Sequence, residues 1–139
     1  MSRRGSTLAL ALAWVGFACG GSDGVGPPPP PPPPPAEPGA VNFHVVTAAN
    51  LEDGGLLLTV LGGAVDSVTG LAGYEVFQTL TTTGARAMVF GSIVDGPLIR
   101  VWVPDVSRAG LYSVRVDEGA IRGTYDVVPG AAYSMTRQP

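Results

Sequence analysis

The sequence predicts an all-β protein, a small single-domain β-sandwich or alternatively a small barrel of about eight or nine short strands. Three observations predict this class. Segments rich in β-branched and aromatic residues recur from residue 40 to residue 139. Turns that contain Gly, Asp or Pro separate these segments, and only one short segment has a helical pattern. We therefore expect the folded domain to span residues 40–139.

The first expected strand is residues 41–48, where Val41, Phe43 and Val45 occupy alternate positions. Residues 56–61 (LLLTVL) form a continuous apolar run, and we expect this strand to be buried on both faces. Further strands are expected at residues 74–80, 85–90, 98–103 and 111–116. Weaker strand candidates lie at residues 64–68, 124–128 and 132–136.

Turn residues mark the ends of several of these segments. Residues 82–84 (TTG) are expected to close a short hairpin, with Gly84 at a position of positive φ. Residues 104–109 are the best helical candidate, because Asp105 can cap a single turn and Gly110 can end it. Six residues are too few for an independently stable helix, so this segment does not change the predicted class.

The Gly-rich opening at residues 53–60 (DGGLLLTV) and the strand count are similar to those of small β-sandwiches of the cohesin-like or immunoglobulin-like kind. The similarity implies the architecture. The immunoglobulin spacing of Cys, Trp and Cys is absent, since Cys19 is the only cysteine of the chain. Because architecture does not define function, the similarity predicts no activity.

The N-terminus has the pattern of an export signal. Arg3 and Arg4 precede an uninterrupted apolar run at residues 8–18 (LALALAWVGFA). This run is shorter than the roughly 20 apolar residues that a membrane-spanning helix needs. We therefore expect residues 1–18 to be a helical signal peptide that is removed on export.

The end of this leader resembles the lipobox of bacterial lipoproteins, in which a small residue precedes an obligatory cysteine. The matching residues are 16–20 (GFACG), with Ala18 before Cys19. The resemblance implies that Cys19 is lipidated and holds the protein in the cell envelope, at the outer membrane if the organism has two membranes. Each buried methylene contributes about 0.8 kcal/mol, so two or three acyl chains anchor a protein durably. The same residues also fit an ordinary signal peptidase site, which would release a soluble secreted or periplasmic protein.

Residues 19–39 are expected to form a disordered Gly- and Pro-rich linker after the lipidated cysteine. Residues 27–35 are nine consecutive prolines. Such a run favours polyproline II at about 3.1 Å per residue, which makes a stiff rod of roughly 28 Å. We interpret the rod as a spacer, and the alternative is a ligand for an SH3-like groove.

The charge of the chain argues against nucleic acid as a partner. The chain has eight basic residues, all arginine, against eleven acids, and its formal net charge is −3. Removal of the leader with Arg3 and Arg4 would change this charge to −5. Binding to a phosphate backbone depends on clustered Lys and Arg, and the sequence contains no such cluster.

The sequence contains no recognisable catalytic, cofactor or metal motif. His44 is the only histidine, lies on the first expected strand and is expected to be a surface residue. No G-x-S-x-G nucleophile motif occurs. One histidine and Cys19 cannot complete a tetrahedral zinc site. The acid pairs at 52–53 and 117–118 precede glycine and are interpreted as turn residues rather than calcium ligands. We therefore expect no enzymatic activity, no metal and no cofactor.

Three arginines stand out by their position on the expected strands. Alternation places Arg86, Arg100 and Arg115 opposite the apolar positions, with Trp102 on the same face as Arg100. If the three strands are neighbours, one sheet face carries three guanidinium groups beside an indole. Such a face suits an anionic glycan or a carboxylate-bearing partner, through bidentate hydrogen bonds and stacking.

Alternatively, the arginines pair with Glu75 or Asp117 on an outer face and lie over Trp102. The sequence thus predicts a non-enzymatic cell-envelope lipoprotein that presents its β domain as an interaction surface, possible partners being an envelope protein or an anionic glycan. One alternative is an envelope glycan-binding module that uses the Arg and Trp face, and another is a hydrolytic envelope enzyme.

Overall fold

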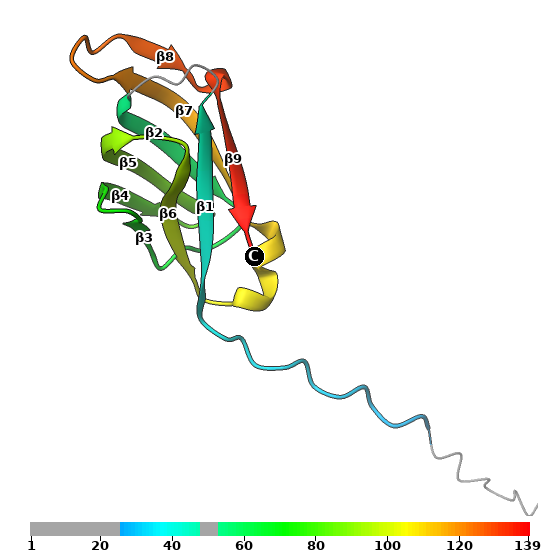
Figure 1. The fold of residues 1–139 in the computed structure, drawn as a ribbon. Helices are drawn as coiled ribbons and strands as arrows, with labels where there is room; N and C mark the ends of the chain where they lie inside the picture. The colour runs from blue at the N-terminus through cyan, green and yellow to red at the C-terminus, as the bar shows by residue number, and fades with distance from the viewer. Residues whose placement is uncertain (1–25, 48–52) are drawn as a thin grey trace, which may run out of the picture. The chain divides into compact units, whose positions relative to one another are not determined.

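The computed structural model describes residues 26–47 and 53–139. The predicted signal peptide and Cys19 lie outside the described residues. The described chain forms nine strands and two short 3-10 helices in two antiparallel sheets, which are not closed into a barrel (Figure 1). The predicted all-β class is confirmed. Of the two predicted architectures, the structure has the two-sheet arrangement and not the barrel.

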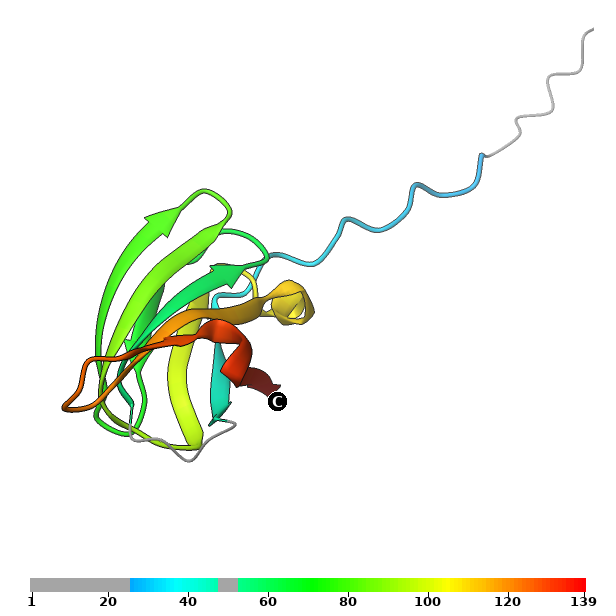
Figure 2. The same ribbon diagram turned by 90° about the horizontal axis from the view of Figure 1, so that it is seen from above.

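The two sheets form separate layers (Figure 2). The four-stranded sheet has the order β3-β6-β1-β9, with β3 at Ser67–Gly70, β6 at Gly96–Val103, β1 at Gly39–Thr47 and β9 at Tyr133–Gln138. The five-stranded sheet has the order β4-β5-β2-β7-β8, with β4 at Glu75–Thr81, β5 at Gly84–Ile93, β2 at Asp53–Leu61, β7 at Ser113–Ile121 and β8 at Val127–Pro129.

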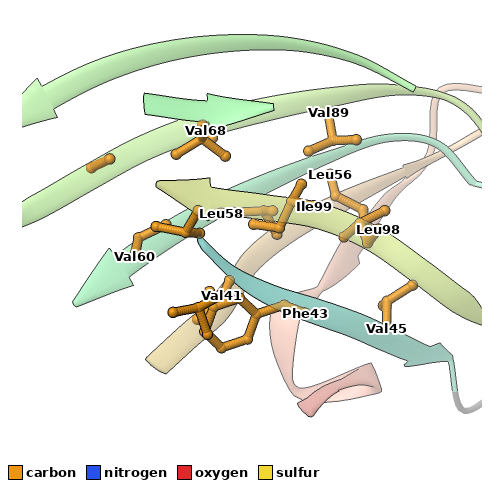
Figure 3. Close-up of a cluster of buried hydrophobic side chains, with 14 of the residues drawn as sticks. Val41, Phe43, Val45, Leu56, Leu58, Val60, Val68, Val89, Leu98 and Ile99 are labelled. Atoms are coloured by element: carbon orange, nitrogen blue, oxygen red, sulfur yellow. The ribbon is translucent and has the colours of Figure 1, made fainter. Parts of the chain in front are cut away.

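The core lies between the two sheets and is built from alternate residues of the long strands. Val41, Phe43 and Val45 of β1 are buried there, as the sequence pattern predicts. Apolar side chains from β2, β3, β5, β6 and β7, together with Val65 and Tyr112, complete the cluster (Figure 3). Because each strand buries only one face in this core, the outer face of each sheet is available for other contacts.

The apolar run at residues 56–61 differs from its prediction. It lies on β2, where Leu56, Leu58 and Val60 are buried in the core. Leu57 is only half-buried, and Leu61 is 45% exposed. The expectation that this strand is buried on both faces is therefore wrong, because no element of the described chain covers the outer face of the five-stranded sheet.

The two connections singled out in the sequence, the helical turn and the hairpin at Gly84, are present, but each differs from its prediction in one respect. The helix η1 spans Val106–Leu111, and Asp105 caps it as predicted by accepting hydrogen bonds from the Ser107 backbone N–H (3.0 Å) and hydroxyl (2.6 Å). The prediction that Gly110 ends the helix is wrong, because Gly110 lies inside it and Tyr112 is the C-cap. Gly84 begins β5 but is not among the glycines with positive φ. A Cβ atom at Gly84 would lie 1.9 Å from the Val60 carbonyl oxygen. Glycine is therefore required here by close backbone approach, not by turn conformation.

The linker and the remaining short elements complete the described chain. Residues 26–38 have no regular secondary structure, and their side chains are exposed. The carbonyl of Glu37 accepts a hydrogen bond from the Val106 backbone N–H (2.7 Å) at the start of η1. A second short helix, η2, spans Gly130–Ala132 and leads into β9. Within the described ranges, no helix is both long enough and apolar enough to span a bilayer.

Candidate functional site

The predicted arginine residues do not share one sheet face. Arg86 lies on β5 and Arg115 on β7, and both strands belong to the five-stranded sheet. Arg100 and Trp102 lie on β6 in the other sheet. The idea that the three strands are neighbours is therefore wrong. The alternation of residues was predicted correctly, but β6 pairs with β1 and β3, while β2 lies between β5 and β7.

Arg86 and Arg115 are both engaged by one carboxylate. They flank Thr59 of β2 in register, and Asp117 lies beside them where a bulge adds one residue to β7. The Asp117 carboxylate accepts a hydrogen bond from the Thr59 hydroxyl (2.6 Å) and forms ion pairs with Arg115 (2.9 Å) and Arg86 (3.7 Å). The alternative prediction, in which these arginines pair with Asp117, is confirmed for both.

The contacts of Asp117 also determine its charge state. Its pKa is lowered first by the hydrogen bond from Thr59 and then by Arg115 and Arg86, while partial burial acts in the opposite direction. The carboxylate is thus held in its charged form by the groups around it. Arg86 and Arg115 thus share a carboxylate counter-ion, although their side chains are 61% and 68% exposed. We conclude that they are weaker candidates for binding an anion than an arginine without such a partner.

Arg100 has a different environment on the outer face of the four-stranded sheet. Its Nε donates a hydrogen bond to Asn42 Oδ1 on β1 (3.0 Å). Its guanidinium carbon lies 5.9 Å from the ring centroid of Trp102, which is 40% exposed. In the described part of the chain no carboxylate lies within ion-pair distance of Arg100. Its two terminal nitrogens are therefore available for a ligand.

The residues around this pair are polar and carry no negative charge. In register, Arg100 lies between Asn42 and Thr69, and Trp102 lies between Ala40 and Ser67. The remaining outward-facing positions of the four described strands include His44, Thr136 and Gln138, and none of these positions holds Asp or Glu. An acidic protein thus presents one sheet face whose only full charge is the Arg100 guanidinium.

The outer face of the five-stranded sheet contains a second feature, which sequence reasoning missed. Four of its side chains are exposed although they are large and apolar: Phe77 (63%), Met88 (47%), Phe90 (37%) and Val127 (68%). Phe77 and Phe90 form an edge-to-face pair with ring centroids 5.9 Å apart. Single exposed apolar residues are ordinary, but a contiguous group on one sheet face is typical of a binding surface.

Three adjoining hollows follow this face. The first, of about 310 Å³, is lined by Leu57, Phe77, Arg86 and Met88 among others. The second, of about 180 Å³, shares Leu57 and Met88 with it and extends past Phe90. The third, of about 370 Å³, begins at Phe90 and is also lined by Arg122 and Tyr125. Because neighbouring hollows share lining residues, we treat the three as one surface and call it the face groove.

The described residues contain no group of side chains suited to binding a metal ion. No group of three His, Cys, Asp or Glu side chains that could hold a metal ion occurs in residues 26–47 and 53–139. His44 lies half-buried on the outer face of β1, paired with Pro97 and Thr136 across the sheet. The site therefore consists of two sheet faces of different chemistry, one polar with a single cation and the other apolar.

Fold and site together define a two-sheet, all-β domain with two exposed, chemically distinct faces. Comparison of the chain with protein-family models, with curated protein sequences and with solved structures returned no match. The functional argument therefore depends on the residues themselves.

Proposed function

We propose that the chain is a non-catalytic, lipid-anchored binding module of the bacterial cell envelope, and that the Arg100–Trp102 face binds a carboxylate-bearing glycan. The observation that supports this most directly is the environment of Arg100. Its guanidinium lacks a carboxylate partner among the described residues and is held beside an exposed indole. A cation without a counter-ion on an otherwise uncharged face is suited to an anionic ligand.

The chemistry of a uronic acid matches this face in two ways. A carboxylate accepts two parallel hydrogen bonds from one guanidinium, and such charge-assisted bonds are stronger than neutral ones. A sugar ring also presents axial C–H groups, which pack on the face of an aromatic ring such as that of Trp102. Asn42, which accepts from Arg100 Nε at 3.0 Å, holds the guanidinium in a fixed orientation. This reduces the side-chain entropy that binding would otherwise cost.

Removal of Arg100 is expected to abolish most of this binding. The probe is an oligogalacturonate, with a neutral oligosaccharide of equal length for comparison, titrated calorimetrically into the full chain. Arg100→Ala should weaken binding of the uronate at least tenfold, because a hydrogen bond to a charged group contributes about 1.5–3 kcal/mol. Trp102→Ala should weaken it by a similar or somewhat smaller factor, and the neutral oligosaccharide should bind weakly to every variant.

Arg108 gives the matched control for charge, because it is an exposed arginine on η1 and not on a strand of this sheet. Arg108→Ala should leave the affinity for the uronate unchanged. Arg100→Lys should recover little affinity, since an ammonium group cannot form the bidentate contact. The proposal is wrong if the wild-type chain binds no uronate above the level of the Arg100→Ala variant.

The anchor is tested separately from the ligand. Cys19 and its leader resemble a lipoprotein signal, and acyl chains on its sulfur would retain the protein in the detergent phase of a Triton X-114 partition. Cys19→Ser is expected to move the exported protein to the aqueous phase, and intact mass of the wild type should show the acyl groups. A wild-type protein found in the culture medium with an unmodified thiol would instead support release by an ordinary signal peptidase.

A further inference from the structure

The backbone beneath the face groove belongs mainly to interior strands of the five-stranded sheet. The strands β5, β2 and β7 are all interior strands, each with a hydrogen-bonded neighbour on both sides. A peptide lying over these three strands therefore meets mainly side chains and few main-chain partners. Any peptide N–H that it buries there loses its bond to water without replacement, which costs free energy. The groove consequently favours a peptide without N–H groups.

Proline is the residue that meets this requirement. A proline run has no backbone N–H, and its rings form a continuous apolar surface in a helix that needs no internal hydrogen bonds. Aromatic-lined grooves bind such helices because the ligand is already extended and loses little entropy. The face groove has such an apolar, aromatic lining, formed by the rings of Phe77 and Phe90 and the side chain of Met88.

The chain itself contains a segment of this chemistry. Residues 27–35 are nine prolines, and those residues are exposed. The face groove follows β5 from Arg86 to Ser92, which corresponds to about 20 Å at roughly 3.4 Å per residue. Six or seven prolines in polyproline II cover the same length at about 3.1 Å per residue. The run is therefore long enough to fill the groove.

The far end of the groove also offers hydrogen-bond donors to the proline carbonyls. Arg122 lines the third hollow and donates to the Ser92 hydroxyl. Tyr125 lines the same hollow, is 81% exposed and has a positive φ of 62°. A non-glycine residue in this conformation is uncommon and is frequently found at functional positions. Glycines at positions 54, 55, 91 and 123 line the hollow as well, so their lack of side chains leaves it open.

We infer that the face groove binds the nine-proline run of a second copy of this chain. The run of the same chain is a poor occupant, because only Ala36, Glu37 and Pro38 connect it to β1, which belongs to the other sheet. A stiff rod joined through three residues does not reverse direction around the domain. Binding between copies links each domain to the linker of its neighbour.

The test uses a blocked nona-proline peptide and the full chain. Titration followed by heteronuclear NMR should show saturable shifts in residues of the face groove, and a Gly-Ser peptide of equal length should cause none. The double variant Phe77→Ala/Phe90→Ala should weaken binding at least tenfold. Trp102→Ala is the matched control, because it removes an exposed aromatic ring from the other sheet. It should leave peptide binding unchanged, while the Phe77→Ala/Phe90→Ala variant should bind the uronate like the wild type.

Sedimentation velocity then identifies the occupant. The full chain should self-associate in a concentration-dependent way, and replacing residues 27–35 by a Gly-Ser segment of equal length should leave a monomer that still binds the peptide. The inference is overturned if the peptide does not bind the replaced variant, or if the double phenylalanine variant binds it as well as the wild type. It is equally overturned if the wild type stays monomeric while its groove is already occupied, since the run would then bind within its own chain.

Discussion

Replacing Phe43 by alanine is expected to lower the free energy of unfolding by about 3–5 kcal/mol. Phe43 is 2% exposed and is the largest of the fully buried side chains (Figure 3). It lies on β1, between Ile99 of β6 and Arg137 of β9 in register, and its ring fills the space between the sheets. Truncation removes the transfer free energy of the ring and leaves a cavity that rigid sheets cannot close.

The measurement is urea unfolding of the full chain, followed by far-UV circular dichroism. Val46→Ala is the matched control, because Val46 lies on the same strand and is 44% exposed. Its loss should change the unfolding free energy by no more than about 0.5 kcal/mol. A domain of this size is typically stable by about 5–15 kcal/mol, so the Phe43 variant loses a large share of the total. Equal effects of the two substitutions would mean that β1 does not bury the face that contains Phe43.

Local patterns in the sequence predict the strands well where one face is buried and the other is polar. In β1, Val41, Phe43 and Val45 alternate with polar residues, and all three are buried as expected. The cap of η1 was also predictable, because Asp105 needs only its neighbour Ser107 to act. These features depend on interactions within a few residues, which the order of amino acids shows directly.

Local patterns of this kind do not predict which strands pair with each other. The faces of Arg86, Arg100 and Arg115 were predictable from alternation, but their grouping depends on which strands are neighbours. Residues far apart in the sequence decide this: β2 pairs with both β5 and β7, and β1 pairs with β6. The tertiary arrangement therefore separates Arg100 from the other two arginines and changes which of them can bind a ligand.

The apolar outer face of the five-stranded sheet has a signal in the sequence, but this signal also fits a strand that is buried on both faces. Apolar residues occur at both even and odd positions of β2 and β5, so one set must face outward if only one core exists. Leu57 is the clearest example, since Leu56 and Leu58 on either side of it are both buried. A continuous apolar run also fits a strand with two covered faces. Only the position of β2 in an uncovered sheet distinguishes the two interpretations.

The substitution Gly84→Ala is expected to lower the unfolding free energy by about 3 kcal/mol or more, although it adds only one methyl group. Gly84 is buried at the start of β5, opposite Leu61 of β2 and Thr81 of β4. Its new Cβ would lie 1.9 Å from the Val60 carbonyl oxygen and 3.0 Å from the Val60 carbonyl carbon. These are backbone atoms of the central strand, so no side-chain rotation relieves the clash, and either β5 or β2 must move.

Movement of either strand would disturb the register that positions both Thr59 and Arg86 near Asp117. Gly110→Ala gives the control, because the nearest atom to its Cβ would be the Arg137 guanidinium at 3.8 Å, and this glycine does not have positive φ. It should unfold at nearly the wild-type urea concentration. If Gly84→Ala does the same, then β2 and β5 do not approach each other as closely at this end of the sheet as the structure shows, and the pairing of Leu61 with residue 84 is wrong.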